Sequence, residues 1–187
     1  MIQKMLMSSG GGGGSLTAKI PPMTGEYTPS GHATASSSAS DWQGYTRQAW
    51  GAMTGNAPSA PSSNANMWLA SGDSLAQNSY VQYQHVAPVS AKFFSIGYCG
   101  CGIASTAIMQ GSNDGEHWTN ISDTITLPQS GPDSRSGLNF YKVVALSTSD
   151  TPYLYTRLQF LTTTNNNYMY NQNYYLIGIT ELQVYGT

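Results

Sequence analysis

Charged residues are scarce in this 187-residue sequence. Seven Lys and Arg and nine Asp and Glu residues make up 9% of the chain and leave a formal charge of −2. Soluble domains usually carry about 25% charged residues. In this chain, uncharged polar side chains and Tyr must therefore provide most of the hydrophilic surface. Such a small net charge gives no electrostatic reason to expect binding to nucleic acid or to an anionic membrane.

Long apolar runs are also lacking. No run approaches the roughly 18 residues that a membrane-spanning helix needs, so we expect no membrane insertion. Near the start, Lys4 precedes three apolar residues, but Ser8 ends that patch. The apolar region of a secretory signal needs about 7–15 residues. The sequence therefore predicts no signal peptide and synthesis in the cytoplasm.

Cysteine is rare, with only Cys99 and Cys101, which one glycine separates. A disulfide between them would close a strained ring. Two thiols without a second Cys or His pair nearby also make a poor zinc site. We therefore expect free thiols, which suit a reducing cytosol.

Catalytic motifs are missing as well. The three histidines lie in no recognisable nucleophile, metalloprotease or triad motif. Asp114 and Glu116 are close in sequence, but Asp114 is needed by a turn, and glycosidase carboxylates need a defined separation across a cleft. The sequence predicts a protein that is not an enzyme, with no catalytic residues and no cofactor.

What the sequence does contain is a series of short β-like segments bounded by turn residues. Leu158 and Phe160 alternate with polar neighbours, as in a strand that buries one face. Asn113-Asp114-Gly115 is typical of a tight hairpin, because these residues tolerate positive φ. The pattern predicts an all-β antiparallel sandwich or barrel, with its main strands at residues 79–87, 92–98, 103–110, 140–146, 155–161 and 175–185.

Two parts of the chain differ in composition. Residues 8–15 read SSGGGGGS, and three prolines follow before residue 30, so residues 1–33 are predicted to be a flexible N-terminal arm. Residues 34–187 are predicted to form the sandwich. The apolar side chains before the glycine run have nothing local to pack on, so we expect them to anchor the chain to other proteins: Met1, Ile2, Met5, Leu6 and Met7.

The order of several motifs resembles the discoidin or coagulation-factor C-type family. GSNDGEHWTNI (111–121) is similar to the family's Ser-x-Asp-Gly-x-x-Trp motif, and TASSSAS (34–40), AWGAMTGN (49–56), MWLASG (67–72), YLYTRLQF (153–160) and ITELQVYG (179–186) follow family order. The resemblance implies a galactose-binding-like, eight-stranded jelly roll with neighbouring termini. It also implies ligand-binding loops at one end, often for sugars. Trp68 and Trp118 then become framework residues, and Arg157 is expected to pair with a carboxylate such as Glu181.

One departure bears on metal binding. Family members frequently hold calcium near the turn that here reads Met53-Thr54-Gly55-Asn56, and Thr54 stands where the family has Asp. Calcium wants about six to eight oxygens, with carboxylates supplying the charge. We therefore expect at most a weakly held Ca²⁺, near Gly55 and Glu181.

Residues 162–175, TTTNNNYMYNQNYY, are rich in Asn and Tyr, as antibody-like contact surfaces are. We predict ligand contacts at Tyr168, Tyr170, Asn171 and Asn173. Trp42 and Tyr45, which no framework motif assigns to packing, are predicted to join them. An inter-subunit contact and a polar loop without a role stay open as alternatives.

The arm followed by a sugar-binding-like sandwich also resembles accessory virion proteins of tailed phages. This resemblance implies a multicopy or homo-oligomeric virion protein, made in the host cytoplasm and joined to other virion proteins through its arm. Two functions stay open: a tail or fibre module that recognises host-surface carbohydrate, and a purely structural decoration or adaptor protein.

Overall fold

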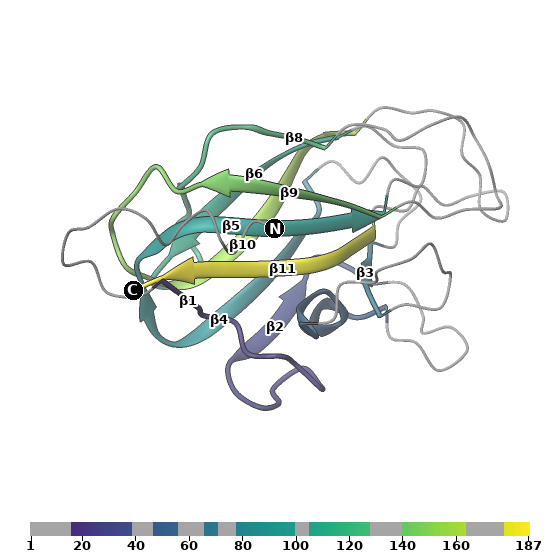
Figure 1. The fold of residues 1–187 in the computed structure, drawn as a ribbon, viewed down its shortest axis with the longest axis horizontal. Helices are drawn as coiled ribbons and strands as arrows, with labels where there is room; N and C mark the ends of the chain where they lie inside the picture. The colour runs from purple at the N-terminus through teal and green to yellow at the C-terminus, as the bar shows by residue number, and fades with distance from the viewer. Residues whose placement is uncertain are drawn as a thin grey trace, which may run out of the picture.

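Two antiparallel β-sheets pack face to face around one core (Figure 1). The computed structural model describes residues 16–38, 47–55, 66–70, 78–99, 105–127, 140–163 and 178–187. Within these ranges the only helix is the short 3₁₀ helix η2 (Ala49–Met53), so no helix there is long and apolar enough to cross a membrane. The predicted all-β antiparallel sandwich is confirmed.

The first sheet has the order β1-β11-β5-β9, and β3 also pairs with β11. Its strands are β1 (Thr17–Ala18), β3 (Trp68–Leu69), β5 (Ala91–Cys99), β9 (Phe140–Leu146) and β11 (Gly178–Gly186).

The second sheet has the order β2-β4-β10-β6-β7, with β8 also paired to β6. Its strands are β2 (His32–Ala35), β4 (Tyr80–Val89), β6 (Ser105–Ser112), β7 (Thr119–Asn120), β8 (Ile125–Leu127) and β10 (Tyr153–Thr163).

Alternating apolar side chains from both sheets form the core. Leu158 and Phe160 of β10 are fully buried, as the alternation predicts, and Val184 of β11 is buried opposite them. Trp68 is also fully buried, with its ring centroid 6.1 Å from that of Phe160. The prediction that Trp68 belongs to the framework is therefore confirmed.

Residues 16–33 differ from the flexible arm that the sequence predicted. β1 pairs with β11, and Ile20 and Met23 are 1% and 2% exposed within the core. The Ile20 N–H donates to Gln183 Oε1 (2.9 Å), and Gln183 Nε2 donates to the Ile20 carbonyl (2.8 Å). Apolar burial and these bonds offset the ordering entropy of the segment. The predicted anchor residues Met1, Ile2, Met5, Leu6 and Met7 lie outside the described residues.

The strand register defines two ends of the sandwich. In the first sheet Cys99 pairs with both Gly178 and Phe140, and in the second sheet Ser105 pairs with Thr163 and Leu127. The strand ends that flank residues 100–104, 128–139 and 164–177 therefore lie at one end, called here the loop end (Figure 1). Of the two predicted free thiols, Cys101 and the side chain of Cys99 lie outside the description.

Candidate functional site

A cavity of about 440 Å³ lies beside β11, where the strand passes the end of η2. Leu182 and Val184 point into the core, so the alternating residues Glu181 and Gln183 point outward. Met53 and Gly55 form the wall on the η2 side, and Lys142, Glu181, Gln183 and Tyr185 form the wall on the sheet side.

Glu181 is the polar centre of this cavity. Its carboxylate accepts hydrogen bonds from the Ser95 hydroxyl (2.7 Å) and from Lys142 Nζ (2.8 and 3.0 Å), and its side chain is only 13% exposed. Gly97 of β5 pairs with both Glu181 and Lys142. A Cβ on Gly97 would lie 2.9 Å from Glu181 Cβ, so the missing side chain lets the lysine cross β5 to reach its partner.

The two residues predicted to hold calcium, Gly55 and Glu181, do line this one cavity. Glu181 is, however, the only carboxylate among the described lining residues, and the Lys142 ammonium already neutralises it. The described part of the chain also contains no group of three or more His, Cys, Asp or Glu that could hold a metal. This donor set fits calcium poorly, and a weakly held ion stays a prediction.

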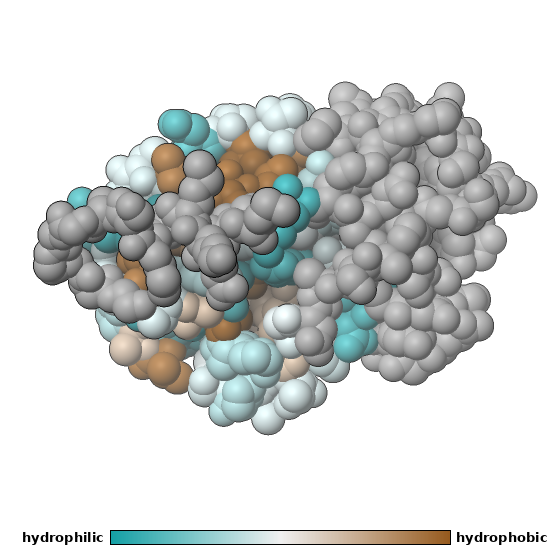
Figure 2. Space-filling view, viewed as in Figure 1, coloured by the Kyte–Doolittle hydropathy of each residue, from teal (hydrophilic) through white to brown (hydrophobic). Residues whose placement is uncertain are grey.

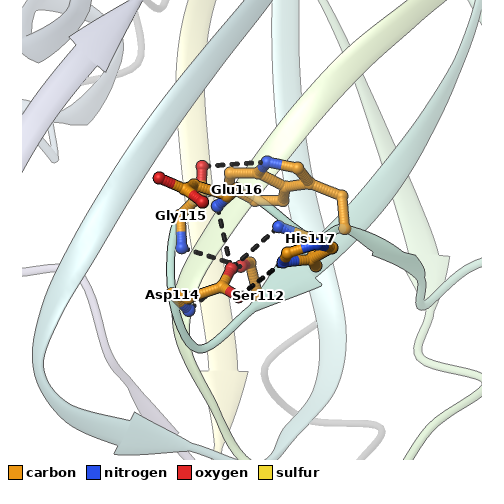
Figure 3. A network of polar contacts seen from close by, with 6 residues as sticks. Ser112, Asp114, Gly115, Glu116 and His117 are labelled. Atoms are coloured by element: carbon orange, nitrogen blue, oxygen red, sulfur yellow. Dashed lines mark hydrogen bonds and ion pairs between the residues drawn. The ribbon is translucent and has the colours of Figure 1, made fainter.

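The predicted hairpin is present between β6 and β7, and Asp114 organises it (Figure 3). Asp114 Oδ1 accepts the backbone N–H groups of Glu116 and His117, both at 2.8 Å, and Gly115 has φ +78°. The backbone N–H groups of His117 and then Glu116 hold the pKa of the Asp114 carboxyl well below its usual range. The predicted hairpin is confirmed, but its connection is longer than a tight turn, since residues 112–118 join the paired residues Gly111 and Thr119. Gly115 is the residue of this connection that has a positive φ.

Ser112, Asp114 and His117 are the residue types of a hydrolase triad, but they are connected differently. In a triad the serine bonds to the histidine, and the carboxylate holds the far side of the ring. Here the Ser112 hydroxyl bonds to Asp114 Oδ1 (3.0 Å) and accepts the Gly115 N–H (2.9 Å), and only Asp114 contacts His117 (2.7 Å). This arrangement closes a turn and does not activate a nucleophile.

Arg157 packs between aromatic rings and does not pair with a carboxylate in the described structure. Its guanidinium carbon lies 3.9 Å from the Trp118 ring centroid and 4.9 Å from that of Tyr80, and Nε donates to Gln110 Oε1 (2.8 Å). The expected pairing with Glu181 is wrong, because the two residues lie on different sheets. Desolvation lowers the pKa of Arg157. Trp118 folds back over the turn and donates to the Gly115 carbonyl, as a framework residue should.

The predicted ligand-contact residues Tyr168, Tyr170, Asn171, Asn173, Trp42 and Tyr45 lie outside the described residues. The structure places the flanking ends of β10 and β11 at the loop end. Sequence reasoning missed Lys142 and Ser95 as partners of Glu181. The alternation in FYKVVAL could have placed Lys142 on an outward face, but only the register across β5 brings it to Glu181.

No protein-family model matches the sequence. No curated protein matches it either. Solved structures do resemble the fold. The family 32 carbohydrate-binding module of NanJ from C. perfringens, in complex with galactose, is 15% identical, with a TM-score of 0.58 over 91% of this chain and 99% of that one.

Two further modules are similar. Chitosan-binding module 1 from a chitosanase/glucanase of Paenibacillus sp. IK-5 is 17% identical, with a TM-score of 0.57 over 91% of this chain and 99% of the module. The family 32 module of AlyQ, in complex with 4,5-unsaturated mannuronic acid, is 16% identical, with a TM-score of 0.54 over 81% and 92%. Identities this low establish the fold alone. The protein has the galactose-binding-like, discoidin-type β-sandwich fold of family 32 carbohydrate-binding modules.

Proposed function

We propose that the chain is a non-catalytic carbohydrate-binding module. The observation that carries this proposal is the fold likeness, which extends over 91% of the chain to a module in complex with galactose and to another described as chitosan-binding. In these relatives the sandwich is a binding unit. A binding role also suits this chain because Ser112, Asp114 and His117 are hydrogen-bonded as a turn and not as a catalytic triad.

The outer face of the second sheet has the surface chemistry that this function needs. The register sets Thr34, Gln82, Gln110 and Asn120 in one row with Arg157 across five strands. Amides and hydroxyls can both donate to and accept from sugar hydroxyls. A neutral ligand also needs few charged residues on the protein, and only 9% of this chain is charged.

The primary sugar contact is assigned to the loop end. Tyr168, Tyr170, Asn171 and Asn173 would supply aromatic faces and amides, and Trp42 and Tyr45 would extend the surface. β10 and β11 hold the two ends of this segment, and rigid sheets that carry recognition loops are a common design of binding proteins.

We further propose that the module sits on a phage tail or fibre in several copies and recognises host-surface carbohydrate. The support is the sequence of residues 1–15, in which five apolar side chains precede a glycine run. Weak single sites gain strength when they are repeated on one particle.

A purely structural virion role is the second candidate, and one observation favours it. Val144 and Leu146 of β9 are 47% and 73% exposed on the outer face of the first sheet. Figure 2 shows hydrophobic atoms gathered over this strand. Exposed apolar side chains that lie together are typical of protein–protein contacts.

A glycan array probed with the full chain, clustered on a multivalent carrier, tests the proposed function. We expect binding to one group of related glycans and its loss when the free sugar competes. A folded chain that binds no glycan, yet is incorporated into virus particles, would favour the structural role.

A further inference from the structure

The cavity beside Glu181 contains hydrogen-bonding capacity that no described residue uses. A carboxylate offers about four acceptor positions, and Ser95 and Lys142 occupy three of them on Glu181. The Lys142 ammonium has three N–H groups, and its contacts with Oε1 and Oε2 of Glu181 use at most two of them. One acceptor and one charged donor therefore remain at this wall.

Gln183 adds a second donor in a fixed position. Its Oε1 accepts the N–H groups of Ile20 (2.9 Å) and Val184 (3.0 Å), and its Nε2 donates one hydrogen to the Ile20 carbonyl (2.8 Å). The other Nε2 hydrogen has no partner among the described residues. Because these bonds already fix the side chain, it loses little entropy when a ligand binds.

The remaining walls are apolar and rigid. Met53 is 2% exposed, so η2 presents a packed side chain. The Tyr185 ring stacks on Phe93, with centroids 4.5 Å apart and planes at 10°. Aromatic rings of this kind suit the C–H face of a sugar ring. The cavity therefore combines an apolar wall with a few convergent polar groups, as small-molecule sites do.

Charge and size narrow the ligand class. Lys142 and Glu181 neutralise each other, so an anion or a cation would meet one like charge for each opposite one. A volume of about 440 Å³ falls within the range of small-molecule sites, roughly 300–1,000 Å³.

We propose that this cavity binds one neutral pyranose through two adjacent hydroxyl groups. One hydroxyl donates to the Glu181 carboxylate and accepts from Gln183 Nε2, and its neighbour accepts from Lys142 Nζ. Tyr185 contacts the ring carbons, and Met53 packs behind the cavity wall. This inference rests on the proposed function and adds a sheet-face sugar site distinct from the contact assigned to the loop end.

Backbone and side-chain amide NMR of the full chain tests the site, with methyl glycosides of galactose, glucose and N-acetylglucosamine as probes. We expect one of them to shift the signals of Gly55, Glu181 and the Gln183 side-chain amide. Lys142→Met should weaken that response by about tenfold, since it removes a charged donor. Lys92→Met is the matched control, because Lys92 forms its own ion pair with Asp150 away from the cavity and the variant should leave the affinity unchanged.

Glu181→Gln serves as a second variant, and the spectrum away from the cavity checks that each variant is folded. Two results overturn the cavity site while the module function stands: shifts confined to signals from outside the cavity, or wild-type affinity in both folded cavity variants. Shifts of the cavity signals by CaCl₂ and by no glycoside would also overturn it, in favour of a cation site. Glycan binding that is absent throughout would instead remove the proposed function itself.

Discussion

His85 is a buried histidine with no place in the proposed binding surfaces. It is 3% exposed on the inner side of β4, with Nε2 3.0 Å from the Thr156 hydroxyl and its ring edge-on to Tyr83. Burial lowers the pKa of His85 to about 4. The imidazole is therefore neutral in the folded protein throughout the mildly acidic range.

This burial predicts a loss of stability in acid. An unfolded histidine has a pKa of about 6.5, so between pH 6.5 and 4 the unfolded state takes up a proton that the folded state refuses. The free energy of unfolding should fall by up to about 3 kcal/mol across that window and should be unaffected by His85 above it. Urea unfolding at pH 7.5 and 4.5 measures this fall, and His85→Gln should make it smaller. An equal fall in both proteins would contradict the prediction.

Because Glu181 already forms an ion pair with Lys142, we predict that folding depends little on metal. The ammonium already supplies the positive charge that a cation would bring to this carboxylate. Chelator treatment should move the melting temperature by only a few degrees, since 1 kcal/mol shifts a domain of this size by roughly 2–4 °C. A drop of more than about 15 °C would show a structural metal.

Local sequence patterns predicted the long strands of the fold but missed the shortest ones. The segments predicted at 79–87, 92–98 and 155–161 lie within or next to β4, β5 and β10, because alternation and turn residues are local signals. Strands of two to four residues, such as β1 and β2, were not predicted. At that length the distant partner decides the pairing, and no local period exists to detect.

In the candidate site, too, some residues could be predicted from local motifs, whereas others depend on the pairing of distant strands. A family resemblance brought Gly55 and Glu181 into one hypothesis, and both line the same cavity. The role of Lys142 depends on β9 and β11 flanking β5, which is a non-local arrangement. The sequence predicted a carboxylate partner for Arg157, because strand alternation does not show which sheet a charged side chain belongs to. In the fold, Trp118 returns from the hairpin and covers it.

The segment between β10 and β11, residues 164–177, is predicted to carry the ligand contact. Replacing Tyr168 and Tyr170 with Ala should leave the melting temperature nearly unchanged, since the sheets supply the stability, and should abolish adsorption to host cells. Tyr27→Ala is the matched control, because Tyr27 is 62% exposed on a different loop and should be dispensable for adsorption. Adsorption that survives while particle assembly fails would make the segment a subunit contact.

For the whole molecule, we predict that residues 1–15 are an anchor. Deleting them should leave the sandwich folded, because Thr17 already pairs with β11, and Ile20 and Met23 are already buried in the core. The truncated protein should nevertheless fail to enter the virus particle, as a particle-association assay would show. A shortened glycine run that keeps Met1, Ile2, Met5, Leu6 and Met7 is the control and should be incorporated. Normal incorporation of the truncated protein into the virus particle would contradict the anchor hypothesis.

The pairing of Thr17 with Gly186 has a mechanical consequence. The chain enters β1 at the end of the sandwich opposite the loop end, and β1 runs antiparallel to β11 (Figure 1). A pull between the N-terminal segment and a ligand held at the loop end would therefore slide β1 along β11. Sliding strains the β1–β11 bonds and both Gln183–Ile20 bonds together. A pull between the two chain termini would instead peel β1 away one bond at a time. The fold is thus oriented to resist tension along the line from the start of β1 to the loop end.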